Sequence, residues 1–551
     1  MTADVVVIGS GPGGATAADV LTAAGRSVVI IEKGRNHLID ITDPDRLLGD
    51  FSNDELKFVH RHFLGPDPVT EPRTFRVGPE DGEHSLVGEV NSIPSTVGGG
   101  GVHADGKVPR FRQEDFALLS TYGPVEGADV ADWPVSYDDL EPYYSAAERS
   151  IGVAGDAGAN PHAAWRSGPY PMAPGAPMYG ATRSARAAEA LGLHPYPAPT
   201  AANSVPYDGR PACNNCGFCS FFGCPVHAKG DPVAMLQRAL RSGRAELWPE
   251  TFAARIRTDG RRATGVEVVQ RDGARLTIGA RAVVVAAGAV ETPRLLLLSG
   301  FDHPLIGRHL MVHFQTITLG VMPERLHTER GRAVTHVHDD AVVVDGEARQ
   351  AARQAGLPWL RGGMVEHGGP SLPVMEAKLY PWGRRHKQLM RSSPMRDHLW
   401  ALIMQGEDLA QPTNTVDLDP TVRDARGFPV ARLTYRPHRH ELAASAHHRA
   451  RLVAVLGAMG ATFTAVVTSP STAAEAAASN GGLSTAPASR HVMGTTRMGT
   501  DPATSVVDEV GRLHDIPNVV VADSSVFVTS AGYGPTLTLV ALAARAAAAL
   551  A

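Results

Sequence analysis

Four cysteines lie within twelve positions of a 551-residue chain that contains no other cysteine. They are Cys213, Cys216, Cys219 and Cys224, in the stretch "ACNNCGFCSFFGCPVHAKG". Their spacing, C-x2-C-x2-C-x4-C with a proline after the last, is one residue longer than a bacterial iron–sulfur run, and thiolates this close together also suit zinc. Three interpretations stay open: an iron–sulfur cluster, a zinc site, and a reduced loop without metal.

A glycine-rich turn near the start of the chain has the spacing of a nucleotide-binding site. In "DVVVIGSGPGGATAADVLTAAGRSVVIIE", residues 4–32, Gly9, Gly11 and Gly14 fit G-x-G-x-x-G. Such glycines allow a tight turn, close approach of the backbone to a pyrophosphate, and close packing of helix on strand. Glu32 ends the second apolar run, where a carboxylate accepts both ribose hydroxyls and disfavours a 2′-phosphate. The motif therefore predicts FAD or NAD rather than NADP.

The pattern around this motif predicts strand, turn, helix and strand, which is the βαβ unit that opens a parallel sheet. Residues 283–299, "VVVAAGAVETPRLLLLS", return to the same pattern, so the nucleotide domain is discontinuous. Alternating segments such as "TVDLDP" and "ARLTYRP" favour antiparallel strands in a second unit. We therefore predict an α/β protein, α+β overall, with a Rossmann-like domain and a mostly antiparallel substrate domain.

The predicted domain boundaries follow these patterns. The nucleotide-binding domain covers residues 1–312, with an extended surface excursion over about 157–212, where proline, alanine and glycine are frequent. The substrate domain covers residues 313–484, and residues 485–551 return to the nucleotide-binding domain.

Composition and charge exclude several classes of partner. The formal net charge is -5 and basic residues form no arm or stripe, so nucleic acid is not expected. The first strand begins within three residues, without a signal peptide, and we expect a cytoplasmic protein. The longest apolar run, residues 537–551, contains Arg545 and falls short of the roughly 20 residues that span a bilayer. It predicts a packed helix and no membrane span.

Three segments together resemble the glucose–methanol–choline (GMC) oxidoreductase family. They are the glycine motif, "AAGAVETPRLLLLSG" in the middle of the chain, and "HVMGTTRMG" followed by "NVVVADSSVFVTSAGYGPTLTLVALAARAA". The resemblance implies FAD as cofactor, a small-molecule alcohol as hydride donor, the flavin N5 as hydride acceptor, and oxygen or another acceptor for the electrons. The domain around the glycine motif is then an FAD-binding domain.

The resemblance also implies roles for individual residues. His491, at the start of "HVMGTTRMG", matches the histidine that takes the alcohol proton, and imidazole suits a base near neutral pH. Asp523 matches the acidic residue near the flavin ribityl chain, and Pro535 belongs to the last motif. The family usually places a second His or Asn just before that proline, where it bonds the substrate hydroxyl. Here Tyr533 and Gly534 precede Pro535, so this partner is missing.

A second glycine run, "STVGGGGVHADGKVPRF", is similar to the family segment that lies against the flavin ring. Gly99 and Gly100 belong to four consecutive glycines that let the backbone come close to the ring. His103 falls where pyranose 2-oxidases carry a histidine bonded covalently to the flavin. We therefore expect His103 either to form that bond or only to pack on the ring.

We expect FAD-dependent oxidation of an alcohol group on a sugar or sugar-like polyol, because the last two motifs look nearest to the pyranose-oxidase and gluconate-dehydrogenase branch. An aminoglycoside CH2OH oxidised to an aldehyde is one such reaction. The alternative is a non-redox lyase or flavin-binding protein of the same fold, which the missing partner permits. An aminated substrate needs carboxylates, and the substrate domain offers Glu366, Glu376, Glu407 and Asp408, although most carboxylates of this kind lie on the surface.

Overall fold

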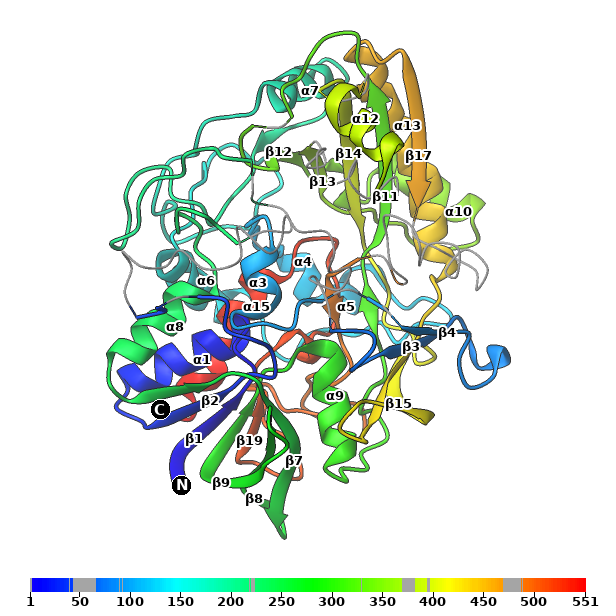
Figure 1. Ribbon diagram of the computed structural model, residues 1–551. Helices are drawn as coiled ribbons and strands as arrows, with labels where there is room; N and C mark the ends of the chain where they lie inside the picture. Colours follow the sequence, from blue (N-terminus) through cyan, green and yellow to red (C-terminus); the bar gives the residue numbers. More distant parts are fainter. Residues whose placement is uncertain are drawn as a thin grey trace.

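The computed structural model describes residues 2–38, 40–42, 66–88, 90–91, 93–217, 219, 223–328, 330–368, 382–393, 397–468, 487 and 489–551. Two large sheets dominate it, one in the lower and one in the upper half of Figure 1. Glu376 lies outside the described residues.

The lower sheet has seven strands in the order β6-β2-β1-β9-β8-β7, with β19 added beside β9. Its strands are β1 (Thr2–Ile8), β2 (Val28–Ile31), β6 (Ala245–Trp248), β7 (Thr251–Asp259), β8 (Arg262–Gln270), β9 (Arg275–Val285) and β19 (Val519–Val521). β1, β2, β6, β9 and β19 pair in parallel, while β7 and β8 form an antiparallel extension. β2 is buried along its whole length, which explains its unbroken apolar sequence. The predicted βαβ unit is therefore correct.

Helices are layered beside this sheet on the side that Figure 1 shows at the left, some of them on its strands and others on those helices. They are α1 (Pro12–Ala23), α6 (Tyr137–Ile151), α8 (Pro232–Arg241) and α15 (Thr536–Ala548). α15 is the apolar C-terminal run, and it packs against α1 and α6. α9 (Gly288–Leu298) follows β9 and packs near β7.

The upper sheet has six antiparallel strands in the order β17-β11-β14-β13-β12-β5. They are β5 (Tyr196–Pro197), β11 (Phe314–Val321), β12 (Val334–His338), β13 (Val365–Gly368), β14 (Leu399–Gly406) and β17 (Phe463–Thr468). α7 (Tyr179–Glu189) and α13 (Arg439–Ala458) pack on it. A smaller sheet contains β3 (Arg73–Arg76), β4 (Leu86–Gly88), β15 (Thr415–Arg423) and β16 (Pro429–Thr434). The predicted fold class is confirmed.

Residues 157–178 contain no strand or helix and lie mostly at the surface, as the composition predicts, whereas the rest of the segment 157–212 differs from an extended surface path. It contains α7 and β5, and β5 pairs with β12 of the upper sheet. Ala181, Ser184, Ala185 and Ala188 of α7 are buried, so small residues let this helix pack closely despite the proline-rich flanks. The part of the segment that contains α7 and β5 therefore belongs to the upper layer.

A two-stranded ladder joins two segments that are far apart in the chain. β10 (Met311–Val312) pairs antiparallel with β18 (Val492–Met493), with Val312 opposite Val492. The residue after β10 therefore lies beside the residue before β18. The remaining elements are α3 (Gly99–His103), α4 (Gln113–Phe116), α5 (Leu118–Tyr122), α10 (Gly346–Gln354), α12 (Arg384–Ser392), η2 (Pro79–Asp81), η3 (Asp340–Val342) and η4 (Ser524–Val526).

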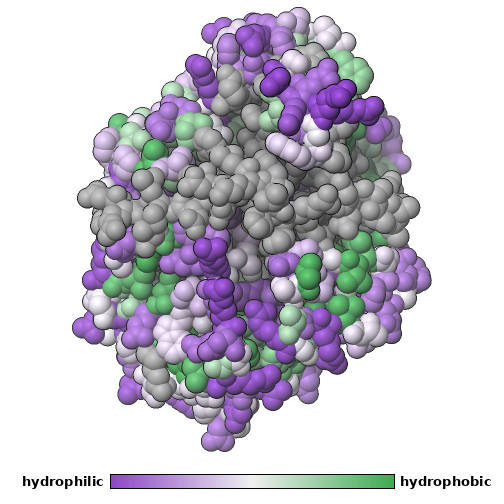
Figure 2. All heavy atoms as spheres, viewed as in Figure 1, coloured by the Kyte–Doolittle hydropathy of each residue, from purple (hydrophilic) through white to green (hydrophobic). Residues whose placement is uncertain are grey.

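Hydrophilic side chains are spread over the upper and lower parts of the face in Figure 2, with smaller hydrophobic patches between them. Among the described residues, no helix has both the length and the apolar character that crossing a membrane requires.

Candidate active site

A cavity of about 600 Å³ is lined by residues of both large sheets. On the lower side it is reached by every residue that the sequence predicts to bind the cofactor or to act as base, except Gly14. These residues are Gly9, Gly11, Glu32, Gly99, Gly100, His103, His491, Asp523 and Pro535. Residues from β11, β13, β14 and β17 form the upper wall. The motifs, although spread along the chain, thus meet at one place.

The glycines of the first motif are required by close backbone contacts. A Cβ on Gly9 would lie 2.3 Å from the Ala286 carbonyl oxygen, and its φ of +99° favours glycine. A Cβ on Gly14 would lie 1.9 Å from the Gly9 carbonyl oxygen, so Gly14 lets α1 pack on the turn. At Gly11 the nearest atom would be the Gly99 Cα at 3.9 Å. A side chain there would fill cavity space instead, as expected where a backbone faces a ligand.

Glu32 stands at the carboxyl end of β2 and is held by three hydrogen bonds. Its Oε2 accepts the Ser10 N–H at 3.0 Å and the Ser10 hydroxyl at 2.7 Å, and its Oε1 accepts the Gly34 N–H at 2.8 Å. Burial raises the pKa of Glu32 despite these bonds. A carboxylate has about four acceptor positions, so this group is oriented and can still accept from a ribose.

Asp523 and Pro535 border the cavity where the chain returns to the lower sheet. The Asp523 carboxylate accepts N–H groups of Gly288 and Ser525 at 2.9 Å each, and burial raises its pKa. Pro535 precedes the first turn of α15, so unpaired N–H groups at this helix start border the cavity. A dinucleotide such as FAD requires three features that meet here: a glycine backbone that it can approach closely, an oriented carboxylate at a strand end, and a helix N-terminus.

His103 is buried at the end of α3. The Lys229 ammonium fixes the chain on both sides of it by donating to the carbonyls of Val102 and Ala104, at 2.6 and 2.7 Å. Lys229 follows the cysteine segment closely in the chain. The hydrogen bonds of Lys229 therefore connect the glycine run to the cysteine segment.

His491 lies beside His313, a residue that no motif predicted. Their Nδ1 atoms are 2.9 Å apart and the rings are nearly perpendicular. The position follows from the β10–β18 ladder, since His313 comes directly after β10 and His491 directly before β18. His313 is one of 23 histidines in the sequence, and no local signal distinguishes it from the others.

The hydrogen bonds around His313 assign the tautomer of His491. The His313 Nε2 lies 3.2 Å from the Ser530 carbonyl oxygen, which can only accept, so Nε2 carries the hydrogen. Burial lowers the pKa of His313 to about 4, so the ring is neutral and its Nδ1 accepts. The His491 Nδ1 must then donate, and its Nε2 keeps a free lone pair. Burial also lowers the pKa of His491 well below its usual value, so this lone pair is available at neutral pH.

Gly534 lies next to His491, as the family pattern implies for this position. A Cβ on Gly534 would lie 3.9 Å from the His491 Cε1 and 3.8 Å from the Lys107 carbonyl oxygen. His313 does not replace the missing residue on the substrate side, because it is fully buried behind His491 and does not line the cavity.

The upper wall is polar at one end and apolar farther along the same strands. Gln315 of β11 pairs with Gln405 of β14, whose amide donates to Glu366 at 2.9 Å. Lys107 contacts Glu366 at 2.5 Å and Asp105 at 2.9 Å. Farther along β11 and β14, the next cavity-lining residues are apolar: Ile317, Leu319, Ala401 and Ile403. Gln315 is two residues from His313, so the polar end is the His491 end.

The expectation that most of the four carboxylates are surface charges is wrong for the three in the described residues. Glu366, Glu407 and Asp408 are 3%, 1% and 1% exposed. Glu366 lines the cavity, whereas Glu407 pairs with the buried Arg361 at 3.1 Å and Asp408 accepts the Val312 N–H. The last two hold the chain in place, because arginine and backbone partners compensate their burial.

None of the four cysteines forms a disulfide in the part of the chain that the structure describes. The Cys213 and Cys224 sulfurs accept backbone N–H groups of Asn215 and Ala228, at 3.4 and 3.3 Å. Burial raises the pKa of the Cys219 thiol to about 12. In the described part of the chain, the four sulfurs do not form a group of three within 4.8 Å of one another. The metal site at these cysteines stays a prediction.

Comparison with known proteins gives three family matches. The sequence model of the GMC oxidoreductases matches residues 128–315 and, in its C-terminal part, residues 410–543. A model described as an FAD binding domain matches residues 2–41. The matched ranges contain the glycine motif, the central motif and the His491 segment.

Relatives of known activity cover nearly the whole chain. The 2-methyl-1,2-propanediol dehydrogenase of Mycolicibacterium austroafricanum is 30% identical over 98% of this chain and 94% of its own length. The paromamine 6'-oxidase of Streptomyces fradiae is 30% identical over 100% and 91%. The gluconate 2-dehydrogenase flavoprotein of Pantoea cypripedii is 28% identical over 98% and 92%.

Solved structures share the fold at low identity. A pyridoxine 4-oxidase from Mesorbium loti is 18% identical with a TM-score of 0.60, covering 100% of this chain and 99% of that one. A formate oxidase is 15% identical with a TM-score of 0.64, covering 100% and 98%.

Proposed function

Because this chain belongs to the GMC oxidoreductase family and is an FAD-dependent oxidoreductase acting on alcohols, we propose that it oxidises an alcohol group of a sugar or sugar-like polyol with His491 as base. The observation that carries the proposal is the His313–His491 pair at the polar end of the cavity. Bound FAD supplies the acceptor for the hydride that leaves the alcohol carbon.

The residues of the chain divide the remaining work. The His491 Nε2 takes the hydroxyl proton, and His313 holds the ring through its accepting Nδ1. Gln315 and Gln405 are placed to bond neighbouring hydroxyls of a polyol, since an amide both donates and accepts. The oxidoreductases among the relatives favour this reading over a non-redox lyase. Anaerobic mixing with sugars, polyols and aminocyclitols tests it directly, because only oxidation of the alcohol bleaches the flavin.

Glu32 and the three motif glycines are proposed to hold the FAD adenosine half. Replacing Glu32 by alanine removes the ribose acceptor and frees the Ser10 and Gly34 N–H groups. We expect FAD affinity to fall by about 10- to 100-fold, since bonds to a charged group are worth about 1.5–3 kcal/mol. Titration of the apoprotein with FAD measures this. The matched control is Glu246→Ala, on the neighbouring β6 outside the cavity, and equal affinity in parent and Glu32→Ala would refute the role.

An aminated sugar is the finer form of the substrate proposal. Asp105 and Glu366 both form ion pairs with Lys107. Burial alone would lower the pKa of Lys107, but these two carboxylates raise it. A substrate ammonium near Glu366 would gain a charge-assisted bond. In Glu366→Gln we expect KM for aminated sugars to rise about tenfold or more, and KM for neutral polyols to change far less. Equal changes for both substrate types would assign the cavity to neutral polyols.

Covalent attachment of FAD at His103 and a metal at the four cysteines stay proposals. Acid precipitation tests the first, because only covalently bound flavin remains in the pellet. Iron and acid-labile sulfide assays on the purified protein distinguish a cluster from zinc and from a bare loop.

A further inference from the structure

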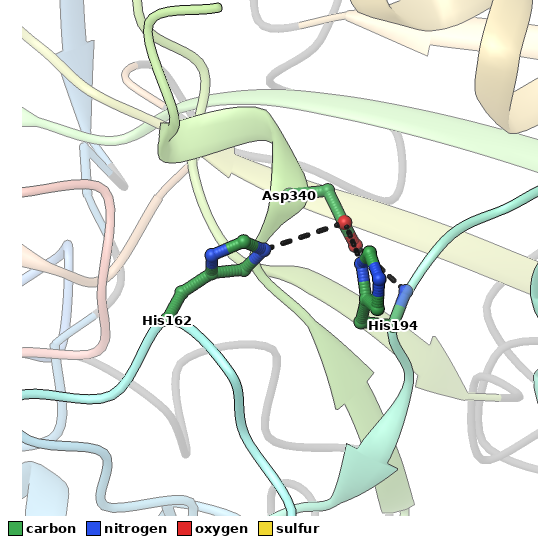
Figure 3. A group of neighbouring side chains, drawn as sticks. All are labelled: His162, His194 and Asp340. Carbon is green, nitrogen blue, oxygen red and sulfur yellow. Dashed lines mark hydrogen bonds and ion pairs between the residues drawn. The ribbon is translucent and has the colours of Figure 1, made fainter.

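Three potential metal ligands meet outside the active-site cavity. His162 lies between α6 and α7, His194 lies between α7 and β5, and Asp340 begins η3. Their ligand atoms all lie within 4.8 Å of one another. In Figure 3 both imidazole rings point toward the Asp340 carboxylate. Residues far apart in the chain thus present two nitrogens and one oxygen to a common point.

The local geometry orients these groups but leaves them incompletely bonded. The His194 backbone N–H donates to the Asp340 Oδ2 at 3.0 Å, which turns Oδ1 toward both rings. The His194 Nδ1 lies 2.6 Å and the His162 Nε2 3.5 Å from Oδ1. The His162 Nε2 is buried and makes no hydrogen bond. A separation of 3.5 Å is long for a hydrogen bond. It is close to the roughly 3.3 Å between two ligands of a tetrahedral zinc ion, given Zn–N and Zn–O distances of about 2.0–2.2 Å, whereas the His194 Nδ1 would have to draw back from its hydrogen bond with Oδ1 to bind the same ion.

Charge around the group favours a divalent cation. The neighbouring Asp339 is 1% exposed, and its Oδ1 is buried without a hydrogen-bond partner. Its Oδ2 accepts from the hydroxyl of Tyr533 at 2.7 Å and the amide of Asn160 at 2.9 Å. Two adjacent carboxylates therefore stand beside two imidazoles, and a divalent ion would balance their charge.

We propose that His162, His194 and Asp340 bind a zinc ion, with water as the fourth ligand. Imidazole nitrogen with one carboxylate suits Zn²⁺, whereas Mg²⁺ and Ca²⁺ prefer an all-oxygen site. The His194 side chain is 55% exposed, so an ion and its water can enter from solvent. This site differs from the cysteine segment in place and in ligand type.

The ion would clamp the 157–212 segment to η3 of the upper half. Asp339 connects this clamp to Tyr533, which directly precedes the Gly534 beside His491. Zinc binding therefore stabilises the wall behind the active site without entering the reaction. Because an ion that binds only the folded state raises its stability, added zinc should raise the Tm of the holoenzyme.

The test measures zinc on FAD-loaded protein by competition with a chromophoric chelator and by elemental analysis. The variants are His194→Ala and Asp340→Asn, and FAD content reports whether each is folded. We expect both variants to bind one zinc ion fewer per chain than the parent, or to bind it at least tenfold more weakly. We also expect both to lose the zinc-dependent rise in Tm.

Three comparisons make the result specific. His194→Cys keeps a zinc ligand and should retain binding, while His447→Ala removes an unrelated histidine of α13 and should change nothing. Zinc held at the cysteines would be unchanged in every one of these variants. Equal zinc content, affinity and Tm response in the parent, His194→Ala and Asp340→Asn would overturn the proposal, as would a parent protein that binds no zinc.

Discussion

Replacing His491 by alanine should slow oxidation of the alcohol by about 10² to 10⁴-fold, the range typical of a general base. The loss should lie toward the upper end, because Gly534 offers no side chain to take over and His313 is buried behind the ring. Binding of the substrate should change much less, since the interaction forms as the proton moves. Rapid mixing without oxygen, followed by flavin absorbance, measures the rate in protein shown to retain FAD.

The pH dependence of the same rate gives an independent check. The base must be neutral, and burial lowers the pKa of His491 well below 6.5. The rate should therefore be constant from neutral pH down through 6.5 and fall only at lower pH, where His491 becomes protonated. A rate in His491→Ala within about threefold of the parent, or a parent rate that already falls between pH 8 and 7, would place the base elsewhere.

The cofactor half of the site could be predicted from the sequence because its constraints are local. Gly9 is favoured by its own positive φ and Gly14 by contact with the Gly9 carbonyl oxygen within one turn, while Glu32 stands at the end of the next strand. Such contacts tolerate few residue types, so they leave a pattern at fixed spacing. The same holds for the His491 segment, which was found only through its motif.

The partner of His491 could not be predicted because it depends on pairing between distant strands. His313 and His491 are 178 positions apart and meet through the two-residue β10–β18 ladder. Neither strand is long enough to show a periodic pattern. The burial of Glu407 and Asp408 could not be predicted for a related reason. Their partners, Arg361 and the Val312 N–H, come from other parts of the fold.

We expect His313 to act as a positioning residue for His491. In His313→Ala the His491 Nδ1–H loses its acceptor, so both the ring orientation and the tautomer with a free Nε2 are no longer enforced. An unsatisfied buried donor costs about 1–3 kcal/mol, so the rate of alcohol oxidation should fall by about 5- to 150-fold. The fall should appear in kcat more than in KM, because His313 does not line the cavity.

A positioning role and a merely structural role for His313 predict different results, and the positioning role predicts the following. His313→Asn offers an acceptor near the former Nδ1 and should recover part of the rate, whereas alanine should not. In His313→Ala the neighbouring ring that helps to lower the pKa of His491 is gone, so the acid limb of the pH profile should move to higher pH. The control is His309→Ala, a buried histidine on the same segment that bonds Asp129 at 2.7 Å instead of His491. Comparable losses of kcat in His309→Ala and His313→Ala, with unmoved pH profiles in both, would show that the His313–His491 contact only stabilises the fold.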